Sequence, residues 1–97
     1  MGVKHAREYE EILAELTEAI HAIGDGYTFF DMGPEDWAAL SAPEQKELMQ
    51  TLADDLFFGL GEDAVIEVGS GTITYRPKHH CIEVSVDGTE SRIIRLV

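Results

Sequence analysis

Cysteine and long apolar runs are scarce in this chain of 97 residues, and each shortage excludes a class of protein. Cys81 is the only cysteine, so no intrachain disulfide can form and a reducing, cytoplasmic compartment is expected. No apolar run reaches the length of a membrane span, and no signal-peptide pattern is present. Repeats and low-complexity stretches are also lacking, so we expect one domain over residues 1–97.

Basic residues are scarce as well: seven Lys and Arg oppose nineteen Asp and Glu, which gives a net charge of −12. The deficit is confined to residues 1–63, which hold 15 acidic and 3 basic residues, whereas residues 64–97 hold 4 of each. A field of this sign repels nucleic acid and anionic membranes and attracts basic partners. We therefore expect a basic protein surface as partner, with no direct nucleic-acid binding and no membrane binding. The alternative is that the acidic charge only keeps the protein in solution.

Apolar residues at helical spacing indicate helices in the acidic part of the chain. Spacings of three and four predict a long amphipathic helix over residues 4–23. Pro34 suits the first position of a short helix over residues 34–40. Residues 27–33 between them form an aromatic connector that could contain a short extended piece.

A capping box marks the third predicted helix, and alternating apolar residues follow it. Ser41 and Glu44 have the spacing at which each side chain satisfies a free backbone N–H, which predicts a helix from residue 41 to about residue 60. The alternating pattern then predicts four short strands, over 64–68, 72–76, 81–87 and 90–97. Asp87-Gly88 is a strong signal for a hairpin turn between the last two strands.

This order of elements predicts an α+β fold, with two or three N-terminal helices packed on one face of a C-terminal four-stranded antiparallel sheet, a meander. The acidic helical part covers residues 1–63 and the β-sheet part covers residues 64–97. In the last strand Ile93 and Ile94 point to opposite faces. That pattern indicates an edge bulge or a second apolar contact, such as a homodimer through this strand.

Acidic side chains form a row along the first predicted helix. Spacings of three and four place neighbouring carboxylates about 5–6 Å apart. We predict that this row binds a basic protein surface, and the alternative is a solvated outer face. The row consists of Glu8, Glu11, Glu15 and Glu18.

The third predicted helix adds three candidate partner-binding residues, Asp54, Asp55 and Phe58. Phe58 falls on the polar side of its helix, where an exposed ring beside acids would suit a binding patch. The alternative, which the sequence favours, is that Phe58 packs under the aromatic connector. The other aromatic residues expected in the core are Tyr27, Phe29, Phe30, Trp37 and Phe57.

Catalytic and metal-binding patterns are weak throughout the chain. His79, His80 and Cys81 are adjacent, but neighbours on a strand point to opposite faces, and a closed zinc site needs four ligands. Cys81 beside a histidine could supply a nucleophile and a base, but no third group that would orient them is identifiable. We therefore predict no catalytic, cofactor-binding or metal-binding residues.

The combined pattern predicts a small acidic protein-binding module rather than an enzyme. In its sharper form it is an inhibitor, of the phage-encoded or immunity type, that occupies a nucleic-acid-binding surface of its partner by charge mimicry. A homo-oligomeric accessory or structural domain is the first alternative. A small enzyme or ligand binder with its site between helices and sheet is the second. No motif is specific enough to indicate a family.

Overall fold

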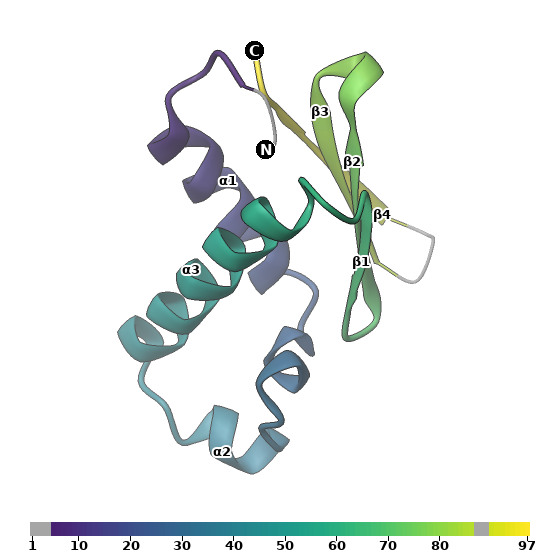
Figure 1. Cartoon of the computed structure of the whole chain (residues 1–97). Helices are drawn as coiled ribbons and strands as arrows, with labels where there is room; N and C mark the ends of the chain where they lie inside the picture. The colour runs from purple at the N-terminus through teal and green to yellow at the C-terminus, as the bar shows by residue number, and fades with distance from the viewer. Residues whose placement is uncertain (1–4, 87–89) are drawn as a thin grey trace.

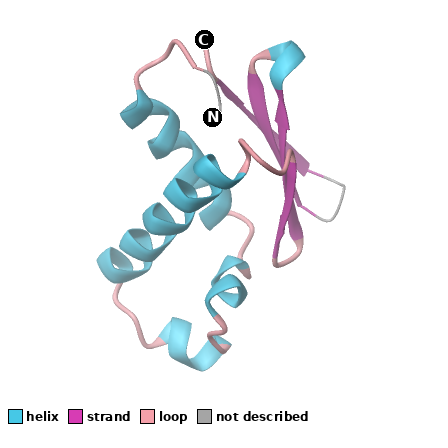
Figure 2. Ribbon diagram, in the orientation of Figure 1, coloured by secondary structure: helices cyan, strands magenta, loops and turns pink. Residues whose placement is uncertain are grey.

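The computed structural model describes residues 5–86 and 90–97, which form a helical layer beside a sheet layer (Figures 1 and 2). The predicted α+β fold, with helices followed by an antiparallel meander, is confirmed. The helical elements are α1 (Tyr9–His21), η1 (Gly26–Phe30, a 3₁₀ helix), α2 (Pro34–Ala38), α3 (Ala42–Gly59) and η2 (Pro77–His79, a 3₁₀ helix). The strands are β1 (Val65–Val68), β2 (Gly71–Arg76), β3 (Cys81–Val86) and β4 (Glu90–Arg95).

The sheet has the strand order β1-β2-β3-β4, and every neighbouring pair is antiparallel. Residues of β3 and β4 pair one to one from Cys81↔Arg95 to Val86↔Glu90, so the ladder contains no bulge and that prediction is wrong. Ile94 is buried, whereas Ile93 is 52% exposed on the opposite face. The predicted Asp87-Gly88 turn lies outside the described residues.

The core lies between α1, α3 and one face of the sheet. In Figure 1 α1 descends from the upper left and α3 rises from the lower left, so the two long helices cross each other, and the sheet is seen nearly edge-on next to them. Burying these apolar side chains is the main favourable term in folding, at about 25 cal/mol per Å² removed from water. The largest fully buried side chains are those of Ile12, Leu16, Ile20, Met49, Leu52, Leu60, Val68, Ile73, Ile82, Val84, Ile94 and Leu96.

Helix α1 begins at Tyr9, not at residue 4 as the periodicity predicts. The backbone N–H groups of Ala6 and Arg7 both donate to the Leu96 carbonyl, at 2.7 and 3.0 Å. Those two bonds hold the preceding segment beside the end of β4, and Glu8 is extended with ψ 131°. A long-range contact that no local pattern encodes therefore fixes the start of this helix.

The local sequence signals predict the starts of α2 and α3 more accurately than the start of α1. Gly33 and Pro34 begin α2 as predicted. At α3 the Ser41 N–H donates to Glu44 Oε1 at 2.8 Å and the Glu44 N–H donates to Ser41 Oγ at 3.4 Å, which is the predicted capping box. Hydrogen bonds from the Ser41 backbone, and in smaller part from its side chain, to the Glu44 carboxylate lower the pKa of Glu44. The aromatic connector, in contrast, forms the 3₁₀ helix η1 and contains no strand.

The β1–β2 hairpin turn is tied to the helical part of the chain. The Ser70 N–H and hydroxyl both donate to Asp25 Oδ1, at 2.9 and 3.0 Å. Gly69 has φ +58°, which favours glycine, and a Cβ on Gly71 would lie 2.5 Å from Ile23 Cδ1. The two glycines therefore let this turn approach the chain just after α1, where Asp25 accepts both hydrogen bonds from the turn.

No helix among the described residues is long and apolar enough to cross a membrane.

Candidate protein-binding surface

The predicted acidic row follows the side of α1 next to β4. Glu8, Glu11 and Glu18 are exposed, and Glu15 is only half-exposed. Glu15 and Glu18 border an open depression of ≈130 Å³ that β4 completes with Arg92, Ile93 and Ile94. Three of the four carboxylates in the row are therefore accessible, and the fourth has a structural partner.

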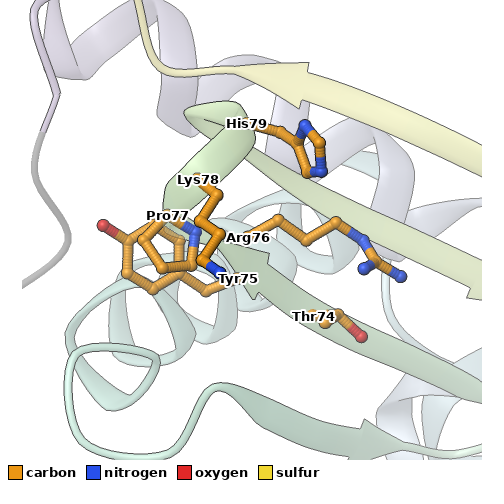
Figure 3. A pocket seen from close by; sticks show the side chains of 6 residues that line it. All are labelled: Thr74, Tyr75, Arg76, Pro77, Lys78 and His79. Carbon is orange, nitrogen blue, oxygen red and sulfur yellow. The ribbon is translucent and has the colours of Figure 1, made fainter.

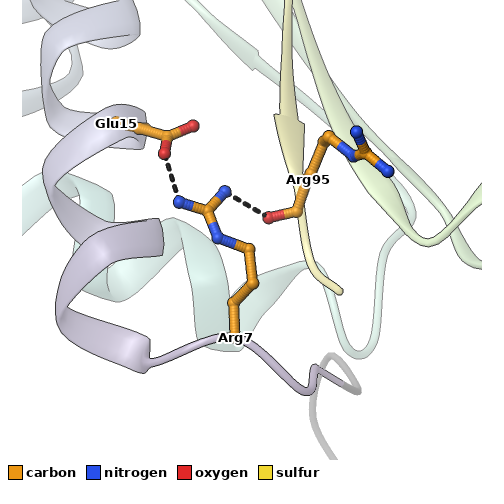
Figure 4. Close-up of polar contacts among 3 residues, drawn as sticks. All are labelled: Arg7, Glu15 and Arg95. Carbon is orange, nitrogen blue, oxygen red and sulfur yellow. Dashed lines mark hydrogen bonds and ion pairs between the residues drawn. The ribbon is translucent and has the colours of Figure 1, made fainter.

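That partner is Arg7, whose guanidinium bridges α1 and β4 (Figure 4). One nitrogen of Arg7 is ion-paired with Glu15, and another donates to the Arg95 carbonyl at 3.0 Å. The hydrogen bond to Glu15 is the main cause of a raised Arg7 pKa. Glu15 thus positions a cation at the edge of the sheet, which sequence spacing alone did not reveal.

Asp54 and Asp55 are neighbours in sequence but have different environments. The Tyr9 hydroxyl donates to Asp54 Oδ1, which joins the start of α1 to the last turns of α3. Burial of the Tyr9 hydroxyl and this hydrogen bond raise the pKa of Tyr9 well above its ordinary value. Asp54 is half-buried in this contact, whereas Asp55 is exposed. Asp54 therefore takes part in a contact between the two helices, whereas the Asp55 carboxylate is open to solvent.

Phe58 does not pack under the aromatic connector, so the interpretation favoured by the sequence is wrong. Its side chain is 64% exposed, and its ring meets Phe57 edge-on with centroids 6.3 Å apart. Phe57 itself is buried and packs against Tyr9 with centroids 4.9 Å apart. Helical spacing explains the difference, because Phe57 follows Ala53 on the core side while Phe58 follows Asp54 on the outer side.

The core prediction for the remaining aromatic residues was also too broad. Phe29 is 48% exposed, and Tyr27, Phe30 and Trp37 are half-buried. Tyr27 and Trp37 stack on each other with centroids 5.7 Å apart, beside the core and not within it. A short 3₁₀ helix and a five-residue helix have too little length to bury large rings on both sides.

The outer face of α1 and α3 contains a shallow trough, which we call the helical groove. Two open depressions form it and share Gln50. The larger depression, of ≈370 Å³, is lined by Leu13, Glu47, Gln50, Thr51 and Asp54. The second, of ≈250 Å³, is lined by Ala14, Thr17, Glu18, Lys46 and Gln50. Leu13 also packs against the core and is only partly buried. The groove was not predicted from the sequence, because the packing distance between two helices is not encoded in either of them.

Acidic side chains dominate the outer face around the helical groove. Lys46 is the only lysine or arginine within α1 and α3. Opposing it are six exposed acidic residues of the same helices, namely Glu10, Glu11, Glu18, Glu44, Glu47 and Asp55. Glu18 of the predicted row thus also borders the helical groove, and Glu44 and Glu47 are exposed acidic residues of α3 that were not identified from the sequence as binding residues.

The sheet layer offers a different surface at the end of the β2–β3 hairpin (Figure 3). An open depression of ≈280 Å³ is lined there by Thr74, Tyr75, Arg76, Pro77, Lys78 and His79. Arg76 is paired with Glu83 at 2.8 Å, and this hydrogen bond raises the Arg76 pKa. In Figure 3 the labelled side chains do not converge on one point, so the depression has no evident set of catalytic groups.

The histidine-cysteine cluster does not assemble into a metal site within residues 5–86 and 90–97. No group of three or more potential ligands lies together in this part of the chain. Cys81 is buried on β3, His79 ends the 3₁₀ helix η2, and His80 has a left-handed backbone with φ +51°. That backbone conformation separates the two histidines from the strand that carries the thiol.

No protein-family model matches the chain, and neither a curated protein nor a solved structure is significantly similar to it. A function can therefore be inferred only from the surfaces of the chain itself.

Proposed function

We propose that the chain is a small protein-binding module that acts by occupying a basic surface of a partner protein. A partner surface that binds nucleic acid has this charge, so the sharper form of the proposal is an inhibitor that competes with nucleic acid. The observation that carries the proposal is the charge of α1 and α3, whose six exposed carboxylates oppose the single Lys46.

The arrangement of charge favours a role in binding over a role in solubility alone. A charge spread over the whole surface would be enough to prevent aggregation. Here the net charge is carried by the helical part, and residues 64–97 are balanced with 4 acidic and 4 basic residues. An uneven field of this kind orients an approaching basic partner toward one face and raises its association rate.

A pull-down from host lysate with a salt-gradient elution tests the proposal. The test variant changes Glu8, Glu11 and Glu18 to Gln, because these three carboxylates are exposed, and leaves Glu15 to hold Arg7. The control variant makes the same three changes at exposed positions off this row, namely Glu35, Glu62 and Glu67. Both variants lose three negative charges, so they differ only in where the charge is removed.

We expect a basic partner that elutes with salt, is lost by the test variant and is retained by the control. The partner's binding to nucleic acid should then decrease as the wild-type chain is added. If both variants lost the partner to the same extent, binding would depend on net charge alone and not on the position of the carboxylates. Retention of the partner by both variants, or elution independent of salt, would contradict the proposal.

A further inference from the structure

We infer that the helical groove is the docking site for one amphipathic basic helix of the partner protein. The inference rests on the proposed function and goes further, because it names the face that is used and the secondary structure of the segment that binds there.

The lining of the helical groove combines a small, largely uncharged floor with walls in which three carboxylates outnumber the single cation, Lys46. Leu13, Ala14 and Thr17 of α1 face Gln50 of α3 across it. Small side chains such as Ala14 let another helix approach closely, since helices pack by inserting ridges of side chains into grooves. Carboxylates along the walls, which are those of Glu18, Glu47 and Asp54, would face basic residues that flank the apolar stripe of the incoming helix.

A third depression extends the groove along α3 toward α2. It has a volume of ≈320 Å³ and shares Glu47 and Thr51 with the larger depression of the groove. Its other lining residues are Leu40, Glu44 and Leu48, so the pattern of leucines beside carboxylates continues. From Glu44 to Phe58 the face spans about 21 Å at 1.5 Å per residue, the length of a helix of about 14 residues.

Backbone hydrogen bonding favours a helix over a strand as the occupant. The backbone groups of α1 and α3 are already bonded within each helix. An added strand would find no free N–H or C=O row along the groove, whereas a helix brings its own satisfied backbone. Apolar residues at helical spacing can then meet Leu13, Leu40 and Leu48, and lysines or arginines beside them can meet the walls.

Charge argues against a second copy of this chain in the helical groove. The chain carries a charge of −12, and the outer helix face is its most acidic part. Two such faces would repel each other, and anionic membranes and nucleic acids would be repelled for the same reason. A basic protein segment is the occupant whose charge fits.

Phe58 supplies an apolar anchor at one end of this face. It follows Asp54, a residue of the groove wall, by one helical turn and so lies on the same side of α3. Its side chain is 64% exposed, although exposing an aromatic ring to water is unfavourable. Aromatic side chains are over-represented among residues that dominate binding energy, which suits Phe58 to contact the apolar stripe of the helix.

The test measures binding of a synthetic 18-residue peptide of lysine and leucine in a helical amphipathic pattern to the full chain. A permuted peptide of the same composition, without the helical pattern, is the probe control. Ala14→Lys places bulk and positive charge in the groove, and Ala38→Lys makes the same change at an exposed position of α2. Phe58→Ala removes the anchor, and Phe29→Ala removes another exposed ring outside the groove.

We expect Ala14→Lys and Phe58→Ala each to weaken binding of the patterned peptide about 10-fold, which is about 1.4 kcal/mol. Ala38→Lys and Phe29→Ala should stay within about 2-fold of wild type, and the permuted peptide should bind more weakly. Salt-sensitive binding that is weakened equally by Ala14→Lys and Ala38→Lys would overturn the groove and leave the proposed function standing. Failure of both peptides to bind at low salt would contradict both proposals. Circular dichroism of each variant confirms that it is folded.

Discussion

The Tyr9 hydroxyl connects two helices through a single contact with a carboxylate. It donates to Asp54 near the end of α3, while the Tyr9 ring packs against the buried Phe57. Tyr9→Phe keeps the ring and removes only the donor, which leaves the half-buried Asp54 without this bond. We expect the free energy of unfolding in chemical denaturation to fall by about 1.5–3 kcal/mol, the usual range for a hydrogen bond to a charged group.

Tyr27→Phe is the matched control for this substitution, because the Tyr27 ring stacks on Trp37 and its hydroxyl makes no hydrogen bond to another described residue. The pH dependence provides a second measurement. Since the pKa of Tyr9 is raised in the folded state, unfolded Tyr9 loses its proton first as pH rises above about 10. Stability should therefore decline with rising pH in this range, and less steeply in Tyr9→Phe. Identical slopes would mean that the contact with Asp54 does not persist in solution.

Individual residues show where sequence reasoning reaches its limit. The exposure of Glu8, Glu11 and Glu18 follows from helical periodicity, which sequence contains. The pairing of Glu15 with Arg7 does not, because Arg7 reaches it only after the segment before α1 turns toward β4. Helical periodicity also placed Phe58 on the polar side of its helix and made it a candidate partner-binding residue, but the favoured alternative, packing under the aromatic connector, was wrong.

At the scale of elements, β4 is an edge strand that the chain partly protects. The Leu96 N–H donates to the His80 carbonyl of the neighbouring strand connection at 2.9 Å. Antiparallel pairs alternate, so the backbone groups of Ser91, Ile93 and Arg95 point away from β3. The Arg7 guanidinium donates a hydrogen bond to the Arg95 carbonyl. This bond removes one acceptor from the row of outward-pointing backbone groups of β4 that could pair with another strand.

Arg7→Gln should therefore increase self-association through β4. The substitution removes the bond to the Arg95 carbonyl and leaves Ile93, which is 52% exposed, beside a longer free edge. Sedimentation equilibrium in about 0.5 M NaCl, where repulsion between acidic copies is screened, should show a mass that rises with protein concentration. Adding Ile93→Lys to this variant should reverse the effect, because charged residues on an edge strand oppose pairing. A monomer mass at every concentration of Arg7→Gln would contradict the role given to Arg7, and the predicted homodimer of the wild-type chain would lose its support.

The elements themselves were largely predictable, because each has a local signal. The capping box at Ser41 and Glu44, Pro34 at the start of α2 and the change from helical to alternating periodicity all act within a few residues. The start of α1 was wrong by five residues, from 4 to Tyr9, because its cause is the pair of bonds to Leu96 at the far end of the chain.

At the scale of the whole molecule, charge and fold divide the protein in the same way. Residues 1–63, with 15 acidic and 3 basic residues, contain the helices of the helical layer, and residues 64–97, with 4 of each, contain the strands of the sheet. The helical layer lies to one side of the sheet (Figure 1), and the acidic residues of the helical part carry the net charge of the chain. A repulsive helical layer destabilises the folded chain, and that cost is understandable if the acidic face serves to bind a partner.

This repulsion predicts that sodium chloride stabilises the protein. Raising NaCl from about 0.02 M to about 0.5 M shortens the Debye length from about 20 Å to about 4 Å, so repulsion among the carboxylates of the helical layer weakens. The midpoint of thermal unfolding should rise over this range. The double variant Asp55→Asn and Glu62→Gln should be more stable at low salt and less sensitive to salt, because both residues lie near the C-terminal end of α3, where negative charge also opposes the helix dipole.

The opposite salt response would have an equally specific meaning. If added NaCl lowered the unfolding midpoint, attractive pairs such as Arg7–Glu15 and Arg76–Glu83 would outweigh the repulsion. The acidic face would then carry no net cost in folding, and the argument that its charge is maintained for binding would fail. A higher midpoint in salt, lost in the double variant, would place the cost in the helical layer, near the C-terminal end of α3.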